Sequence, residues 1–139
     1  MNASGKVLVD TSAWINFFRK IEPCHTVVMQ LMAEERVCSV GLIVAELMQG
    51  AKSEKELAVF RDFTHVFPFL PESSKIWQAA GELAFQLRRK GKTIGLSDCY
   101  LAVAAREGNA EILTQDRHFE IMKDEAKIRL FSGPCLIQR

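Results

Sequence analysis

The chain has 139 residues, of which 48% are apolar and 25% charged, and its formal net charge is +1. This length predicts one domain spanning residues 1–139, with a core large enough to be stable without disulfide bonds or a structural metal. The near-zero charge excludes a global attraction to nucleic acid, so any such binding needs a local basic patch. No apolar run approaches the roughly 18 residues of a membrane helix, and the N-terminus does not resemble a signal peptide.

The cysteines lie far apart in the sequence and form no C-x-x-C pair, and no histidine stands at zinc-finger spacing from them. This pattern is typical of reduced, mostly buried thiols and predicts a cytoplasmic protein. The residues concerned are Cys24, Cys38, Cys99 and Cys135.

Strand and helix patterns alternate through the first half of the chain. Continuous β-branched and aliphatic residues predict a buried parallel strand, whereas apolar residues at a spacing of three or four predict helices. The hydroxyls of Thr11 and Ser12 are expected to cap the first helix. In chain order we expect a strand at 6–10, a helix at 13–20, a helix from Pro23, a strand at 37–40, a helix that contains Glu46 and ends near Gly50, and a helix from Ser53.

The second half continues the alternation. Pro68 places its extended segment at a strand end or a sheet edge, because proline cannot donate to a ladder. The expected elements are an extended segment at 66–70, a long helix at 73–90, an alanine-rich helix at 97–107, a strand at 110–114, a turn at Asp116 leading into 119–122, and a strand at 128–131. Strands that alternate with helices predict an α/β fold with a mainly parallel sheet.

Four carboxylates stand out against these elements. Glu46 lies inside an apolar helical run, where an unpaired charge would be desolvated at high cost. Asp10 and Asp116 each follow an apolar strand, and Asp98 opens a helix. Taken singly, the aspartates have plainer explanations: a helix cap, a residue in a turn, or a charge that favours the helix dipole.

Together these carboxylates carry more information, because a parallel sheet brings the residues after its strands to one edge. Carboxylates at close range raise one another's pKa unless a cation neutralises them. The hard cation that suits such a site is Mg²⁺, with Mn²⁺ as an alternative. A metal ion held beside carboxylates can support phosphodiester hydrolysis.

Four segments of the chain resemble the acidic motifs of PIN-domain ribonucleases in order and spacing. They are 7–12 (VLVDTS), 44–50 (VAELMQG), 96–105 (LSDCYLAVAA) and 113–119 (LTQDRHF). The size and the short opening before Asp10 are most similar to VapC-type toxins. The resemblance implies a three-layer α/β/α sandwich, Mg²⁺-dependent RNA cleavage, a homodimer and a VapB-type antitoxin.

The resemblance also implies roles for individual residues. Asp10 and Asp98 would be the main metal ligands, with Glu46 and Asp116 completing the site. The hydroxyls of Ser12 and Thr114 would orient these carboxylates. Two positions depart from the commonest pattern: Asn16 stands where an acid is frequent, and Ser97 where alanine is frequent.

Two further groups of residues allow more than one interpretation. Basic side chains at the end of the 73–90 helix either match the helix dipole or contact RNA phosphates; they are Arg88, Arg89, Lys90 and Lys92, and Arg117 is a further candidate. The aromatic residues Trp14, Phe17 and Phe18 either mark a partner surface or pack between two helices.

Three other functions are compatible with an acidic pocket. An aspartyl phosphatase of the haloacid dehalogenase type also begins from an aspartate after the first strand, but it needs a second one where Ser12 stands. A receiver-like signalling domain needs paired acids early in the chain, and no acid precedes Asp10. A catalytically silent PIN-like binding module would not need the intact acids.

Overall fold

The computed structural model describes residues 5–131. Three parallel strands form the sheet in the order β2-β1-β3, with β1 at Val7–Val9, β2 at Val37–Cys38 and β3 at Glu111–Leu113. Val7 is the register partner of both Val37 and Glu111. All of β1 is buried, which explains its continuous aliphatic sequence. The helices are α1 (Thr11–Phe18), α2 (Cys24–Ala33), α3 (Gly41–Gln49), α4 (Glu54–Arg61), α5 (Phe63–Val66), α6 (Ser74–Arg89), α7 (Leu96–Glu107), α8 (His118–Ile121) and α9 (Lys123–Ala126).

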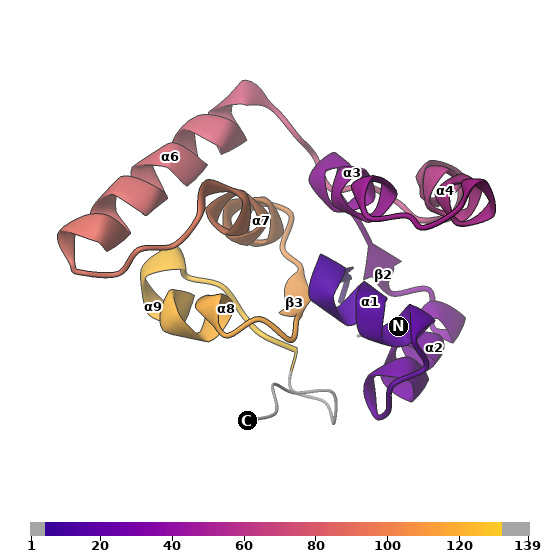
Figure 1. The fold of residues 1–139 in the computed structure, drawn as a ribbon. Coiled ribbons are helices and arrows are strands. Elements are labelled where there is room, and N and C mark those ends of the chain that lie inside the picture. The colour runs from indigo at the N-terminus through magenta and orange to yellow at the C-terminus, as the bar shows by residue number, and fades with distance from the viewer. Residues whose placement is uncertain (1–4, 132–139) are drawn as a thin grey trace.

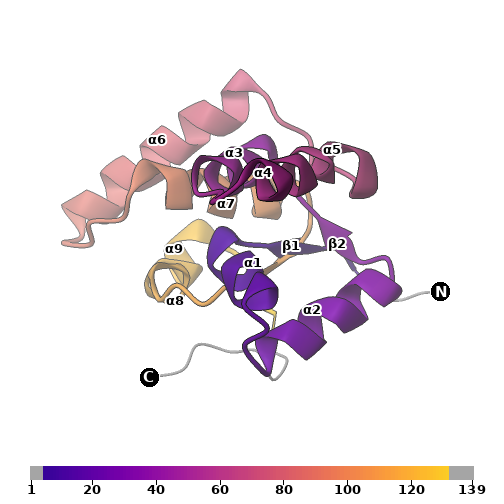
Figure 2. The same cartoon turned by 45° about the vertical axis from the view of Figure 1, so that its right-hand side comes forward.

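Helices cover both faces of the sheet, as expected for a three-layer α/β/α sandwich (Figure 1). The chain leaves β1 through α1 and α2 to reach β2 at one edge, then returns past β1 to β3 at the other edge. Parallel crossovers are right-handed, so steps in opposite directions place their helices on opposite faces. Figure 2 shows this division, with α1 and α2 on one side of the sheet and α3, α4 and α7 on the other.

Two short segments extend the sheet at its edges. Ser39 forms a parallel bridge with Phe69, and Ile112 forms one with Leu130. The carbonyl of Pro68 accepts from the Ser39 N–H at 3.0 Å, so the proline does lie at a sheet edge. The expected extended segment at 66–70 begins one residue late, because Val66 still belongs to α5. The expected strand at 128–131 is reduced to one bridge, because the ladder runs only to and from Ile112.

Helix α7 lies at the centre of the fold, and its residues from Cys99 to Ala105 are all buried. Small alanine side chains let it pack closely against both the sheet and α6. The core-facing side of α6 consists of Ile76, Ala80, Leu83 and Leu87, and Ala84 beside them is half-buried. The buried body of α7 fixes the position of Asp98 in its first turn.

The start of α1 differs from the prediction. The helix begins at Thr11, not at Ala13, so Thr11 and Ser12 lie inside its first turn and do not cap it. Asp10 occupies the cap position, but its side chain makes no capping hydrogen bond. The Thr11 and Ser12 hydroxyls instead bond to the carboxylates of Glu46 and Asp10. The Thr11 and Ser12 hydroxyls therefore orient acidic side chains and do not cap the helix.

The aromatic residues of α1 form one cluster with those of α4 and α5. Trp14 is buried and its ring lies 4.8 Å from that of Phe63, measured between centroids. Phe18 packs edge-on against Phe60 at 5.3 Å, yet 38% of Phe18 stays exposed. Packing between helices therefore explains most of this aromatic surface, and Phe18 is the member that also faces solvent.

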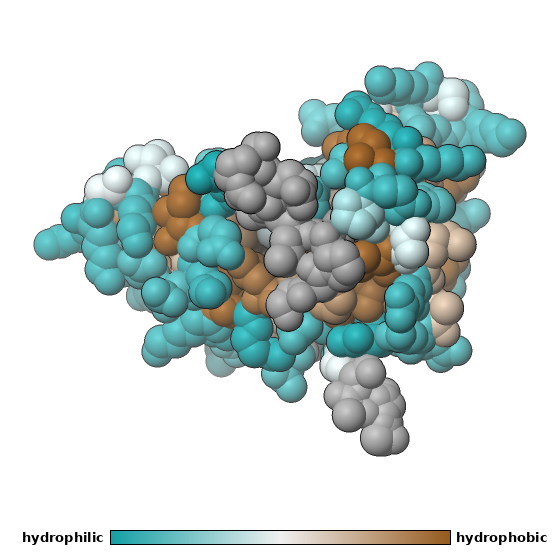
Figure 3. Space-filling view, turned by 90° about the horizontal axis from the view of Figure 1, so that it is seen from below, coloured by the Kyte–Doolittle hydropathy of each residue, from teal (hydrophilic) through white to brown (hydrophobic). Residues whose placement is uncertain are grey.

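The face shown in Figure 3 is mainly polar, and the described cysteines are buried. Across residues 5–131, no helix combines the length and apolar content that crossing a bilayer demands. The face in Figure 3 is mainly hydrophilic, with hydrophobic patches between the polar side chains. Cys24, Cys38 and Cys99 are buried, and burial raises the pKa of Cys38 and of Cys99 to about 11. Cys135 lies outside the described residues.

Tyr100 connects α7 to the start of α3. Its hydroxyl donates to Glu72, whose second oxygen accepts from the Gly41 N–H at 3.0 Å. Burial, then the hydrogen bond to Glu72, raise the pKa of Tyr100 above its usual range, so the hydroxyl stays protonated. We expect Tyr100→Phe to lower the free energy of unfolding by about 1.5–3 kcal/mol, because it removes a hydrogen bond to a charged group. Urea denaturation measures this, and an unchanged midpoint would contradict the role given to the bond.

Candidate active site

The candidate site lies at the carboxyl ends of two neighbouring parallel strands. Asp10 directly follows β1, while Thr114 and Asp116 follow β3. The Asp10 N–H donates to the Leu113 carbonyl at 2.9 Å, which holds the two strand ends together. From β1 the chain crosses to β2 on one side and then to β3 on the other side, so a topological switch point lies between β1 and β3. Open α/β sheets bind ligands at such points.

Asp10 is the most buried of the four carboxylates, with 4% of its surface exposed. One of its oxygens, Oδ2, accepts from the hydroxyls of Ser12 at 2.9 Å and Thr114 at 2.8 Å. Burial raises the pKa of Asp10 to about 6, against the lowering effect of these hydrogen bonds. The negative charge of Asp98 raises the pKa of Asp10 further.

Asp98, Asp116 and His118 form the tightest group in the site. The Nδ1 atom of His118 lies 2.8 Å from Asp98 Oδ2 and 3.5 Å from Asp116 Oδ1. Burial raises the pKa of Asp98, the hydrogen bond to His118 opposes this, and the charge of Asp116 raises it again. The hydrogen bond to Asp98 raises the pKa of His118. One potential ligand atom from each residue lies within 4.8 Å of the other two, which suits a shared cation.

Glu46 approaches the site from α3. The sequence predicted that its carboxylate is desolvated, but the structure leaves it partly exposed. Its neighbours Ile43, Val44 and Leu47 are buried, but Glu46 is only half-buried. The apolar run fills the inner face of α3, and Glu46 lies at the edge of that face. Its Oε1 accepts from the Thr11 hydroxyl at 2.6 Å. Since Thr11 is next to Asp10, this bond joins Glu46 to the strand end.

The predicted acidic residues are therefore drawn together unequally. Asp98 and Asp116 share a cation-sized group with His118, whereas Asp10 adjoins them through Thr114 and Glu46 through Thr11. The Thr114 hydroxyl also accepts from the Asp116 N–H at 2.9 Å, so one side chain fixes residues of both strand ends. The Ser12 hydroxyl does the same by accepting from the Gln115 N–H at 2.9 Å.

His118 was not among the residues that the sequence predicted for the acidic site; beside Asp116, it allowed either an RNA contact or an ordinary polar turn. It stands in an exposed turn, where polar residues are common, and 46% of its side chain is exposed. The available signal is its place two residues after Asp116, because an aspartate after a strand often accepts from the N–H two positions on. Asp116 Oδ1 accepts from the His118 N–H at 2.9 Å, and this turn directs the imidazole toward Asp98.

Because His118 adds an imidazole nitrogen to the carboxylates, we expect a different metal preference from that of a site made of carboxylates alone. Imidazole nitrogen favours Ni²⁺ over Mg²⁺, whereas carboxylate oxygen suits Mg²⁺. We expect His118→Ala to lower the affinity for Ni²⁺ about tenfold or more while the affinity for Mg²⁺ falls less. Calorimetric titrations at pH 8 measure both constants. Equal losses for the two metals would show that His118 only orients Asp98.

The basic cluster at the end of α6 is partly paired within the chain. Lys92 lies 2.7 Å from Glu125, and Lys90 lies 3.9 Å from the same carboxylate. Arg89 stacks over Phe85 at 5.7 Å. Lys90 and Lys92 therefore have a structural role in pairing with Glu125, which differs from both roles predicted from the sequence. A role in RNA contact stays a prediction for Arg88, Arg89, Lys90, Lys92 and Arg117.

Comparison with known proteins identifies the family of this chain. A family model described as the PIN domain matches residues 7–125. VapC ribonuclease Mb1587 of Mycobacterium bovis is 29% identical over 121 residues, which cover 84% of this chain and 90% of the relative. Ribonuclease VapC1 of Methanocaldococcus jannaschii is 26% identical over 120 residues, with coverage of 86% and 82%. A chain in the structure of DNA-bound VapBC from Salmonella typhimurium has a TM-score of 0.73 and 25% identity, with coverage of 92% and 98%.

The match spans most of the chain and includes the elements that carry the four acidic residues. The protein belongs to the PIN-domain family. Its relatives include proteins named VapC ribonucleases, as the motifs around Asp10 and Asp98 indicated. This assignment displaces the haloacid dehalogenase and receiver-like alternatives.

Proposed function

We propose that this chain is a Mg²⁺-dependent endoribonuclease that hydrolyses RNA phosphodiester bonds, and the toxin of a type II toxin–antitoxin pair. The observation that carries the proposal is the convergence of Asp98, Asp116 and His118 within 4.8 Å, beside the buried Asp10. The names of the relatives, VapC ribonucleases, support RNA as the substrate. The single domain 1–139 is part of the same proposal.

The donor set fits a divalent cation. Carboxylates whose pKa is raised by burial and by one another gain most from a positive charge between them. Asp98 and Asp116 would hold the ion together with the imidazole of His118, with Asp10 as a further ligand beside this group and Glu46 completing the site. Mg²⁺ suits the carboxylate oxygens, and Mn²⁺ suits the same set. A bound ion would neutralise charge on the phosphate and on the leaving oxygen.

The remaining chemistry is assigned to the chain's own residues. Ser12 and Thr114 keep the Asp10 carboxylate in one orientation through hydrogen bonds of 2.9 and 2.8 Å. Glu46, half-buried at the edge of the site, orients or deprotonates the attacking water, and Asp116 is the second candidate for this task. Thr11 fixes one Glu46 oxygen at 2.6 Å, and the second oxygen is the one assigned to the water.

The proposed partners are a VapB-type antitoxin and a second copy of this chain, in the cytoplasm. Solved structures that resemble this fold are titled VapBC complexes, including one from Rickettsia felis bound to a promoter DNA fragment. Exposed aromatic side chains on α6, Trp77 at 45% and Phe85 at 46%, offer surface for such contacts. Co-expression with the product of a small adjacent upstream reading frame, followed by co-purification, tests the antitoxin.

A nuclease assay tests the activity directly. Purified protein is incubated with structured and single-stranded RNA, with Mg²⁺, with EDTA, and with EDTA followed by excess Mg²⁺. The proposal expects internal cleavage that EDTA stops and Mg²⁺ restores. A protein that binds its partner but cleaves no RNA with either Mg²⁺ or Mn²⁺ would instead be the silent binding module.

A further inference from the structure

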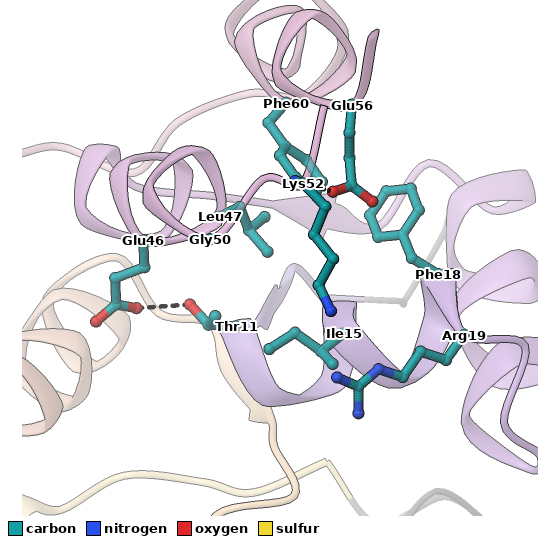
Figure 4. A pocket seen from close by; sticks show the side chains of 10 residues that line it. All are labelled: Thr11, Ile15, Phe18, Arg19, Glu46, Leu47, Gly50, Lys52, Glu56 and Phe60. Carbon is teal, nitrogen blue, oxygen red and sulfur yellow. Dashed lines mark hydrogen bonds between the residues drawn. The ribbon is translucent and has the colours of Figure 1, made fainter. Parts of the chain in front are cut away.

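A pocket opens next to the acidic site, between α1, α3 and α4 (Figure 4). Its volume is about 230 Å³. That is below the roughly 300–1,000 Å³ of a site that encloses a whole small molecule. The pocket therefore suits one unit of a longer chain. Its lining includes Ile15, Phe18, Arg19, Glu46, Lys52 and Phe60.

Two cationic side chains point into this pocket. In Figure 4, Lys52 extends from the loop before α4 to a point above Ile15, and Arg19 extends from the end of α1 to a point beside and below Ile15. Within residues 5–131, neither side chain forms an ion pair. The nearby Glu56 is engaged at the start of α4, where its carboxylate accepts from the Lys52 backbone N–H at 2.7 Å. Because the lining also includes the carboxylates of Glu46 and Glu56, the pocket has no net positive charge, and an anion from outside the chain would bind locally at the ends of Arg19 and Lys52.

The walls of the pocket are apolar and partly aromatic. Phe18 is held by its ring contact with Phe60, at 5.3 Å between centroids, and 38% of Phe18 is exposed. Ile15, one turn earlier on α1, is also 38% exposed. A fixed, exposed ring is a platform on which a nucleobase can stack, and such stacking contributes about 1–3 kcal/mol per base.

The pocket and the acidic site share a wall. Thr11 and Glu46 line the pocket, and the 2.6 Å hydrogen bond between them places both beside Asp10. A ligand that runs from the acidic site into the pocket would meet carboxylates first and then two cations over an apolar surface. An RNA strand matches this order, because its phosphates are anionic and its bases have flat aromatic faces that stack on apolar side chains. With a net charge of only +1, the chain depends on such local cations for affinity.

We propose that this pocket binds one nucleotide of the RNA substrate adjacent to the cleaved bond. The base lies against Phe18 and Ile15, and its phosphate lies between Arg19 and Lys52. The inference rests on the proposed nuclease function and adds to it the place where the substrate is held. A protein segment is the competing occupant, and the test below separates the two.

The test measures RNA binding in EDTA, so that it does not depend on cleavage. Fluorescence anisotropy of a labelled single-stranded RNA is recorded over a series of salt concentrations for wild type and for Arg19→Gln/Lys52→Gln. Each lost phosphate contact lowers the slope of log K against log salt by about 0.7 for single strands. We expect the double variant to bind about tenfold more weakly at low salt, with a slope smaller by at least one such contact. The matched control is Arg61→Gln/Lys75→Gln, which removes the same residue types from exposed positions on α4 and α6.

Each outcome decides something. Unchanged affinity and slope in Arg19→Gln/Lys52→Gln, while wild type still cleaves RNA, overturns the pocket and leaves the nuclease intact. If Arg19→Gln/Lys52→Gln binds RNA as wild type does but no longer co-purifies with the antitoxin, the pocket binds a protein. That result also overturns the proposal. If wild type neither binds nor cleaves RNA, the nuclease function itself fails. A photocrosslink from 5-iodouridine RNA to Phe18, mapped by mass spectrometry, would support the proposed position of the base.

Discussion

We expect Asp98→Asn to reduce RNA cleavage at least about 1,000-fold, because it removes a charge worth several kcal/mol to metal binding and catalysis. The substitution keeps the shape of the side chain, and an amide can still meet His118, which lies 2.8 Å from Asp98 Oδ2. The fold should therefore survive. Single-turnover cleavage at saturating Mg²⁺ measures the loss, and circular dichroism in EDTA checks the fold.

The matched control for this substitution is Asp124→Asn. Asp124 is an exposed aspartate in the first turn of α9, outside the candidate site. It removes the same charge from the same kind of side chain, and we expect cleavage within about twofold of wild type, since isolated surface charges contribute little. Full Mg²⁺-dependent cleavage by Asp98→Asn would refute the assignment of this residue. Equal losses in the two variants would point to a general effect of charge instead.

Asp10 predicts a second large effect, on stability against pH in the absence of metal. Its pKa is about 6 in the folded protein, against 3.8 for an unperturbed aspartate, mainly because the side chain is buried. The folded state therefore holds the Asp10 proton more tightly than the unfolded state. This contribution to stability is gained as the pH falls through about 6 and is lost as the pH rises, the reverse of a salt-bridged aspartate. Lowering the pH from about 8 to about 5 should add about 1–2 kcal/mol.

The variant Asp10→Asn isolates that contribution from other titrating groups. It cannot ionise, so the part of the pH dependence centred near 6 should disappear from its chemical denaturation curves, recorded in EDTA. At about pH 8 the variant should be more stable than wild type without metal. Added Mg²⁺ should stabilise wild type more than the variant, because the folded wild type is expected to bind the ion more tightly. Identical pH profiles for the two proteins would contradict the burial of an ionisable Asp10.

The sequence was sufficient for the parts of the site that depend on chain order. Asp10 and Asp116 were expected to meet because both follow strands of one parallel sheet, and β1 and β3 are indeed neighbours. Asp98 was expected at a helix start and lies in the first turn of α7. Such placements follow from local periodicity and from the rule that ligands bind at the carboxyl ends of parallel strands.

The parts that the sequence did not predict depend on side-chain direction. An apolar run around Glu46 indicated burial, but which edge of α3 faces the sheet is decided by packing against α1 and α4. Thr11 and Ser12 fit a helix cap as well as they fit a carboxylate partner, and only the tertiary arrangement chooses between these bonds. His118 looked like an ordinary turn residue, because its contact with Asp98 crosses 20 positions of sequence.

The central claim is that acidic residues from separate elements form a shared binding site for a divalent cation. Calorimetric titration of Mn²⁺ or Mg²⁺ into the metal-free protein tests it most directly, with Asp10→Asn, Asp98→Asn and Asp116→Asn beside the control Asp124→Asn. We predict saturable binding by wild type and control, and a loss of about tenfold or more in each of the three site variants. The claim is contradicted if wild type shows no saturable binding, or if all variants bind the ion as wild type does.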